Sequence, residues 1–444
     1  MRSRRVAKRP LSALWGLALA IVIAACGSAG APTGTTTTPG QSKPDTPVGK
    51  FSGKTVNLLR WAGDPWTAAT KDAASRWDAA TGGQLTVGAI PYENLETKEA
   101  LALSSGTGSY DILYVHPGWF GQFAKAGYLQ GIGGYLSDAG MNPSGFSTSD
   151  YIPAIFKQGS YNGKQYCLQD QVSTILVAYR KDLYQKYNLK APTSWDDLLN
   201  NAKVLNAQSG MAGLAIPGKA IGDISDVMSS LLTGEGTWWY DSHGKAALDV
   251  AKTTQAIQFY VNASKYSPSG MLNMHYDDVT TAAAQGKAAQ LITLSTELAW
   301  LNDPSKSKTV GDWAYAPLAY NGKAGGELIY WNWCIAAGSK NPKAAYSFLQ
   351  WYTSTPEQAK IAPVAATGGA TKGFYADQSL TQSLPFLPAM QQALANSNPQ
   401  PSLAQWPQLQ DKIEHAVQSA ISGSTSPAQA AQEISQQLRS TLGT

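Results

Sequence analysis

Cysteine and histidine are scarce in this chain of 444 residues: there are three cysteines and four histidines. Both residue types serve as nucleophiles, proton carriers and metal ligands. The histidines stand at 116, 243, 275 and 415, without a metal-binding spacing, and neither G-x-S-x-G nor H-E-x-x-H occurs. The sequence therefore favours a protein without catalysis, and we expect no metal and no cofactor.

A near-match to a phosphate-binding loop lacks a residue that its chemistry needs. Gly213–Ala220 follows the pattern up to its last position, where Ala220 replaces the hydroxyl residue that would bind Mg²⁺. We interpret Gly213–Pro217 as a strand followed by a loop.

Acidic residues are absent from positions 1–25, which contain a basic head: Arg2, Arg4, Arg5, Lys8 and Arg9. Removing these five charges from the net charge of +4 leaves about −1 for the remainder. Such a balance gives no electrostatic footprint for nucleic acid, so no nucleic-acid partner is expected.

The basic head and the apolar residues 11–25 predict a signal peptide over 1–25, because this run is shorter than the roughly 20 residues of a membrane span. Its end, Ile23-Ala24-Ala25-Cys26, resembles a bacterial lipobox and predicts a lipid on Cys26. The alternative is an ordinary signal peptide with an incidental cysteine. Arg4-Arg5 leaves Sec and twin-arginine export both open.

After Cys26 the chain is rich in Gly, Ser, Thr and Pro, and residues 26–53 are predicted to be a lipidated flexible tether. We therefore expect an extracytoplasmic protein that is anchored to the outer face of the cell membrane and touches the membrane only through its lipid.

The remaining length exceeds what one hydrophobic core usually serves, so two lobes are expected. Between 55 and 129, apolar runs at 55–61, 85–90 and 111–115 alternate with helical patterns, which predicts a mostly parallel α/β sheet. Ligands bind at the carboxyl ends of such strands. The residues at these ends are Trp61, Asp64, Trp66, His116 and Trp119.

The stretch 162–183 is interpreted as a crossing between the lobes. It begins with the turn Asn162-Gly163-Lys164, continues through an apolar run over 173–179, and opens a helix at Arg180. Asp170 and Gln171 would face the cleft between the lobes. We expect a second crossing in the strand 328–336 and a third near 382–385.

Several short segments follow one another along the chain: Asp111–Val115 with Trp119 and Gly127–Leu129, Gly163–Tyr166, Tyr179–Leu183, Pro192–Trp195, Gly286–Ala289, Gly325-Gly326, Gly338–Pro342 and Phe348-Leu349. In this order they resemble the segments of the family-1 extracellular solute-binding proteins, the sugar-binding receptors of bacterial ABC importers. The resemblance covers about residues 54–440, and each segment is weak alone. After Tyr166 the family's proline is missing, and Cys167-Leu168-Gln169 stands instead.

The resemblance implies a periplasmic-binding-protein-like α/β fold whose two lobes close on a ligand by hinge motion. The lobes would be 54–166 with 335–383, and 167–334 with 384–444. It also implies a monomer that delivers a sugar or oligosaccharide to an ABC permease.

Sugars present hydroxyl groups and apolar C–H faces, so a site needs carboxylates and amides beside aromatic plates. Single residues also have plainer interpretations: Asp64 as a helix cap, Trp300 as core, Glu297 as a solvated side chain. In addition to Trp66 and His116, the candidates are Asp64, Asp170, Gln171, Glu297 and Asn332 for the hydroxyls, and Trp61, Trp119, Trp300, Trp331 and Trp406 for the apolar faces.

The family's hinge strands run side by side, which implies that Cys167 and Cys334 are neighbours. In an oxidising compartment a disulfide is then favoured over two buried thiols. Two other functions stay open: a surface glycoside-processing enzyme with two carboxylates across the cleft, and the same fold with a non-sugar solute such as a polyol, polyamine or phosphodiester.

Overall fold

The computed structural model describes residues 46–63, 65–403 and 405–444. The predicted signal peptide, Cys26, most of the tether and Asp64 lie outside the described residues. Within the described ranges, no helix combines the length and the apolar character that a membrane span needs.

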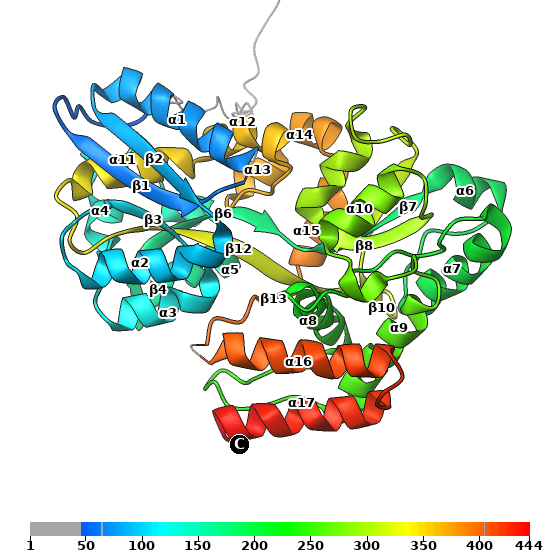
Figure 1. Ribbon diagram of the computed structural model, residues 1–444. Helices are drawn as coiled ribbons and strands as arrows, with labels where there is room; N and C mark the ends of the chain where they lie inside the picture. The colour runs from blue at the N-terminus through cyan, green and yellow to red at the C-terminus, as the bar shows by residue number, and fades with distance from the viewer. Residues whose placement is uncertain (1–45, 64, 404) are drawn as a thin grey trace, which may run out of the picture. The chain divides into compact units, whose positions relative to one another are not determined.

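Thirteen strands and seventeen α-helices make up the described part of the chain, with short 3₁₀ turns between them (Figure 1). The strands are β1 (Thr55–Trp61), β2 (Gln84–Ile90), β3 (Ile112–Val115), β4 (Ser160–Tyr161), β5 (Lys164–Gln165), β6 (Cys167–Ser173), β7 (Ile175–Arg180), β8 (Gln290–Leu294), β9 (Trp313–Pro317), β10 (Ala319–Tyr320), β11 (Lys323–Ala324), β12 (Gly326–Ile335) and β13 (Ser397–Pro399). The helices are α1 (Trp66–Thr81), α2 (Leu95–Ser104), α3 (Pro117–Lys125), α4 (Gly133–Ser137), α5 (Pro153–Phe156), α6 (Lys181–Lys186), α7 (Trp195–Ser209), α8 (Asp223–Glu235), α9 (Val250–Ser264), α10 (Tyr276–Ala284), α11 (Pro342–Tyr352), α12 (Thr355–Ala365), α13 (Lys372–Ala376), α14 (Gln378–Ser383), α15 (Leu387–Leu394), α16 (Trp406–Ile421) and α17 (Pro427–Leu442).

A six-stranded sheet organises the first lobe, in the order β13-β12-β3-β1-β2, with β6 also paired to β12. β1 is parallel to both β2 and β3, as the alternation of strands and helices predicts, whereas β12 is antiparallel to β3 and β6. Successive residues of β3 enter different cores: Ile112 and Tyr114 pack in one, Leu113 and Val115 in the other. Both faces of the sheet are therefore buried, which is typical of α/β proteins.

A three-stranded sheet, β8-β7-β9, organises the second lobe. Its strands are antiparallel neighbours, and Ile175, Val177 and Ile292 enter a core shared with helices α7, α8, α9, α16 and α17. Helix α7 begins where the sequence predicts, because the Ser194 hydroxyl accepts the backbone N–H of Asp197.

The two sheets meet at Thr174. In Figure 1, β6 and β12 run side by side from the first sheet toward β7 and β8. Thr174 is fully buried, and its carbonyl oxygen accepts the N–H of Ser295, so the backbone leaves its pairing with β12 at this residue. The predicted run 173–179 is thus two strands separated by one switching residue.

Two local predictions differ from the structure. Gly213–Pro217 is not a strand: it makes a single bridge, Ala215 with Leu291, and its neighbour Ala212 makes another with Ala288. The predicted tether reaches into the folded body at its end, since the Phe51 ring stacks on Trp77 at 5.7 Å. Tertiary packing, which a local pattern does not record, decides both.

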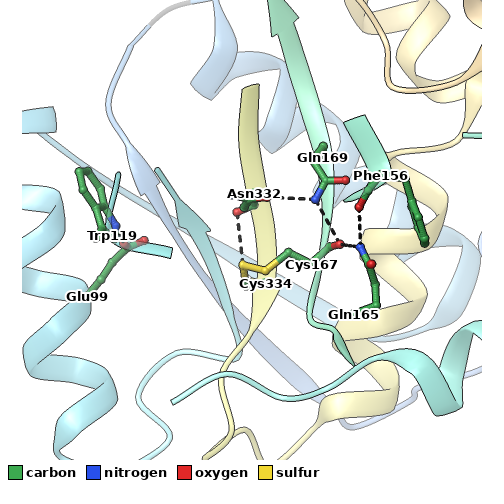
Figure 2. The surroundings of a disulfide bond; sticks show 8 residues. All are labelled: Glu99, Trp119, Phe156, Gln165, Cys167, Gln169, Asn332 and Cys334. Atoms are coloured by element: carbon green, nitrogen blue, oxygen red, sulfur yellow. Dashed lines mark hydrogen bonds between the residues drawn. A yellow bond between two sulfur atoms is a disulfide. The ribbon is translucent and has the colours of Figure 1, made fainter. Parts of the chain in front are cut away.

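The hinge strands are joined covalently. Cys167 and Cys334 are direct cross-strand partners on β6 and β12 and form a disulfide, with Cα atoms 4.4 Å apart (Figure 2). Both residues are fully buried. Two register positions along the same strands, the Gln169 side-chain amide donates to the Asn332 side-chain oxygen at 3.0 Å.

Candidate functional site

A cavity of about 860 Å³ lies between residues of the two lobes. Trp61 and Trp66, from β1 and the start of α1, line one side. Glu297 and Trp300 line the other, on the 3₁₀ segment that follows β8. The sequence predicted all four as ligand residues, Trp61 and Trp66 from their positions at a strand end and Glu297 and Trp300 from their side-chain chemistry, and all four line this cavity.

An aromatic wall continues from Trp61 along the first lobe, with Trp331 at its centre. The Trp331 ring stacks on Tyr114, with 4.7 Å between centroids, and lies 6.0 Å from Trp61. Tyr92 and His116 meet it edge-on at 6.1 and 5.1 Å. Trp331 is only partly buried, and this wall therefore offers flat apolar surface next to the cavity.

Beneath the wall lies a buried polar trio, formed by Tyr114 of β3 and by Asp170 and Gln171 of β6. The Tyr114 hydroxyl lies 2.6 Å from an Asp170 carboxylate oxygen and 2.5 Å from the Gln171 side-chain oxygen. Burial raises the pKa of Asp170 to about 6, although the Tyr114 hydrogen bond opposes the shift. Gln171 has a positive φ of 52°. The structure thus places Asp170 and Gln171 as supports behind the ring of Trp331.

Carboxyl groups line the second lobe's side. Burial, then the nearby Asp277, raises the pKa of Glu297 to about 7. His275 also lines the cavity, and its Nδ1 lies 2.6 Å from the Asp223 carboxylate at the start of α8. Acidic side chains are therefore found from Glu297 and Asp277 at the cavity to Asp223, at the start of α8, which His275 contacts.

The sequence analysis missed several residues of this region: Tyr92, Asp223, Asp226, His275 and Glu327. Asp223 and Asp226 lie at the start of a helix that follows the predicted strand 213–217. In the first lobe, Trp61 and Trp66 were chosen as candidates because they stand at the end of a predicted strand, so the same argument could have found these two acids. Their neighbours Tyr92, His275 and Glu327 carry no such signal, because only the tertiary structure brings them near.

Three other predicted residues lie away from the cavity. Asn332 is fully buried between strands, and Trp406 is 3% exposed and packs against Trp239. Trp119 is mostly buried, and its indole N–H donates to Glu99 at 2.9 Å (Figure 2). Its ring contacts His116 at 4.8 Å, so it supports the aromatic wall from behind.

A second cavity, of about 370 Å³, lies outside the site. Phe146, Tyr151 and Trp351 are among its lining residues, and none of the predicted ligand residues is. The described residues contain no group of three His, Cys, Asp or Glu side chains that could hold a metal ion.

The raised carboxyl pKa values predict that stability falls as pH rises. The pKa is about 8 for Asp226 and about 7 for Glu297 and Glu414, against ordinary values of 3.8 and 4.5, mainly because of burial. The folded state therefore holds protons that the unfolded state releases, so unfolding becomes easier between about pH 4.5 and pH 8. Burial lowers the pKa of His116 to about 3, which acts in the opposite sense, but only below about pH 6.5.

Urea denaturation at about pH 6.5 and about pH 8 checks this expectation. The free energy of unfolding should be smaller at pH 8, and Glu297→Gln should reduce the difference. An equal or larger value at pH 8 would contradict the prediction.

Two α/β units, connected by paired strands and separated by a cavity with aromatic and acidic walls, define a two-lobe binding protein. The family model for bacterial extracellular solute-binding proteins matches residues 63–359, and the chain belongs to that family.

Similar proteins agree with this assignment. The mannitol-binding protein of Pseudomonas aeruginosa is 28% identical over 56% of this chain and 57% of its own length. The erythritol/L-threitol-binding protein of Mycolicibacterium smegmatis is 24% identical over 84% and 81%. The chain thus spans little more than half of the first of these relatives and most of the second.

Solved structures show the same fold. Maltose-bound MalE3 of T. maritima superposes with a TM-score of 0.76 at 21% identity, covering 88% of this chain and all of that one. A solute-binding protein of Agrobacterium radiobacter K84 in complex with ribitol gives 0.75 at 24% identity, with the same coverage. The chain therefore has the two-lobe fold of periplasmic binding proteins.

Proposed function

We propose that this protein is an extracytoplasmic receptor that binds a sugar or a sugar alcohol in the cavity between its lobes and delivers it to an ABC permease. The observation that carries the proposal is the cavity itself: Trp61, Trp66 and Trp300 supply flat apolar faces, and Glu297 supplies hydrogen-bond acceptors. A polyhydroxylated solute needs this combination.

The relatives support the same class of ligand. Those that match include binding proteins for mannitol, erythritol or L-threitol, and maltotriose. In this proposal Cys26 carries the lipid that holds the receptor at the membrane, and the protein acts as a monomer. Lobe closure about the β6–β12 crossing would enclose the solute.

A thermal-shift screen with sugars and sugar alcohols tests the proposal. A ligand should raise the unfolding temperature, because a solute that binds only the folded state stabilises it in proportion to ln(1 + [L]/Kd). The same mixtures, analysed by chromatography after incubation, should contain the unchanged solute. Product formation would instead favour the glycoside-processing enzyme, and the absence of any shift would contradict a sugar receptor.

A further inference from the structure

His275 is a polar side chain of the cavity that the sequence analysis did not single out as a ligand residue. It lines the cavity together with Asp277 and Glu297, and it is the last residue before α10. Its backbone N–H donates to the Asp278 side chain at 2.9 Å, which fixes the start of this helix. The helix therefore sets the position from which the His275 ring enters the cavity.

One side of the His275 ring is held by Asp223. Nδ1 lies 2.6 Å from a carboxylate oxygen of Asp223, whose side chain is 3% exposed at the start of α8. The neighbouring Tyr276 donates its hydroxyl to the Asp223 backbone carbonyl at 3.2 Å, which joins the starts of α8 and α10 a second time. Because a carboxylate only accepts hydrogen bonds, Nδ1 carries a proton and the ring is held in one orientation.

The other ring nitrogen, Nε2, is open. No described residue forms a hydrogen bond with it, and it is not one of the buried polar atoms that lack a partner. The His275 side chain is 38% exposed, in contrast to its partner Asp223. Nε2 is therefore an accessible hydrogen-bonding atom on a ring that lines the cavity.

The role of Nε2 in a hydrogen bond depends on the charge of the ring. Burial lowers the pKa of His275, but the hydrogen bond with Asp223 outweighs this effect, and the pKa is raised overall. With the proton on Nδ1, Nε2 accepts a hydrogen bond in the neutral ring and donates one in the charged ring. A hydroxyl group both donates and accepts, so it can pair with either form.

We propose that Nε2 of His275 forms a hydrogen bond with a hydroxyl group of the bound solute, and that Asp223 is the positioning residue that orients the ring for this contact. This inference rests on the proposed function and deepens it, because it assigns the recognition of a hydroxyl group to one atom of the second lobe. A solute without a hydroxyl group at this place leaves Nε2 unpaired, so His275 discriminates against it.

Two substitutions of similar shape separate the two ring nitrogens. In His275→Asn, the short side-chain amide can replace Nδ1 and keep the contact with Asp223, but no atom reaches the place of Nε2. In His275→Gln, the longer side chain can place its amide where Nε2 was, but it loses the contact with Asp223. The buried Asp223 carboxylate then lacks its side-chain partner, which lowers the stability of the folded state.

Isothermal titration measures Kd for sorbitol, xylitol, glucose and maltose, and for any further solute that raises the unfolding temperature in the thermal-shift screen. For a solute that binds the wild type, His275→Asn should raise Kd about five- to tenfold, as expected for one lost hydrogen bond. His275→Gln should keep Kd closer to that of the wild type. The unfolding temperatures should rank in the opposite order, with His275→Gln the less stable variant.

Asp223→Asn tests the positioning role, because it keeps the shape of the side chain and removes its charge. It should raise Kd in the wild type and have no further effect in the His275→Asn background, since it acts through the ring. His415→Asn is the matched control. Nδ1 of His415 lies 3.4 Å from an Asp411 carboxylate oxygen, but His415 does not line the cavity, so this substitution should leave Kd unchanged.

The possible failures are distinguishable. An unchanged Kd in His275→Asn overturns the inference and leaves the sugar receptor standing. Equal increases of Kd in His275→Asn and His275→Gln, or a Kd that worsens in step with the unfolding temperature, indicate a structural role only and overturn the assignment to Nε2. If none of the solutes binds the wild type, the proposed function fails, and this inference fails with it.

Discussion

Removal of the Cys167–Cys334 disulfide is expected to lower the free energy of unfolding by about 2–5 kcal/mol. The bond closes a loop with a sequence separation of 167 residues, so on the chain-entropy account it restricts the unfolded chain strongly, with a stabilisation at the upper end of that range. It also joins two strands whose side chains lie in one core. The double variant Cys167→Ala/Cys334→Ala, unfolded with urea beside the wild type, measures the effect.

The wild type with and without a reductant provides the control. Both sulfur atoms are buried, so the reductant acts on the unfolded chain, and its presence should bring the wild type toward the double variant while leaving the variant unchanged. Alkylation of both cysteines in denatured, unreduced protein, detected by mass spectrometry, would show that the bond is absent. An unchanged free energy of unfolding in the double variant would contradict the predicted stabilisation.

Trp331→Ala is expected to weaken solute binding by about 2–4 kcal/mol, which is a roughly 30- to 900-fold increase in Kd. The Trp331 ring contacts Trp61, Tyr114, Tyr92 and His116, and it also meets Trp119 at 6.4 Å. Its removal takes away an apolar surface for the solute and removes packing contacts that hold the neighbouring rings in place. Titration of a solute found in the thermal-shift screen measures the change.

Two further variants separate binding from folding. Trp331→Phe keeps a flat ring and should restore most of the affinity. Trp406→Phe changes another aromatic residue that the sequence analysis predicted at the site, but one that packs in the core against Trp239. It should lower the unfolding temperature and leave Kd unchanged; a loss of affinity as large as that of Trp331→Ala would place Trp406 at the ligand after all.

Local patterns predicted most of the elements near the site. The run 55–61 is β1, and the helical pattern from Trp66 to Thr81 is α1, which ends at Gly82 with a φ of 74°. Apolar periodicity and a left-handed glycine are local signals, so a single sequence contains them. The run 213–217 has a strand-like composition too, yet its neighbours allow it only isolated bridges.

The site residues, too, were predictable where the signal was local and not where it depended on tertiary contacts. Trp61 and Trp66 were found because strand ends face ligands in α/β sheets, Glu297 and Trp300 because of their residue types, and all four line the cavity. Trp406, at the start of α16, was also predicted as a ligand residue, but it packs in a core against Trp239. The sequence gives no signal for the contact of Glu327 with Asp226 of α8, since the two residues are about a hundred positions apart.

The sequence by itself indicated the α/β class, the crossing stretch at 162–183 and the aromatic and acidic residue types of a polyhydroxyl site, because each depends on neighbours in the chain or on the residues themselves. Only the tertiary structure decided which of those residues meet. The convergence of five rings on Trp331, for example, needs segments from separate parts of the chain. Contacts of that kind leave no local pattern, since the fold alone sets the distance between their partners.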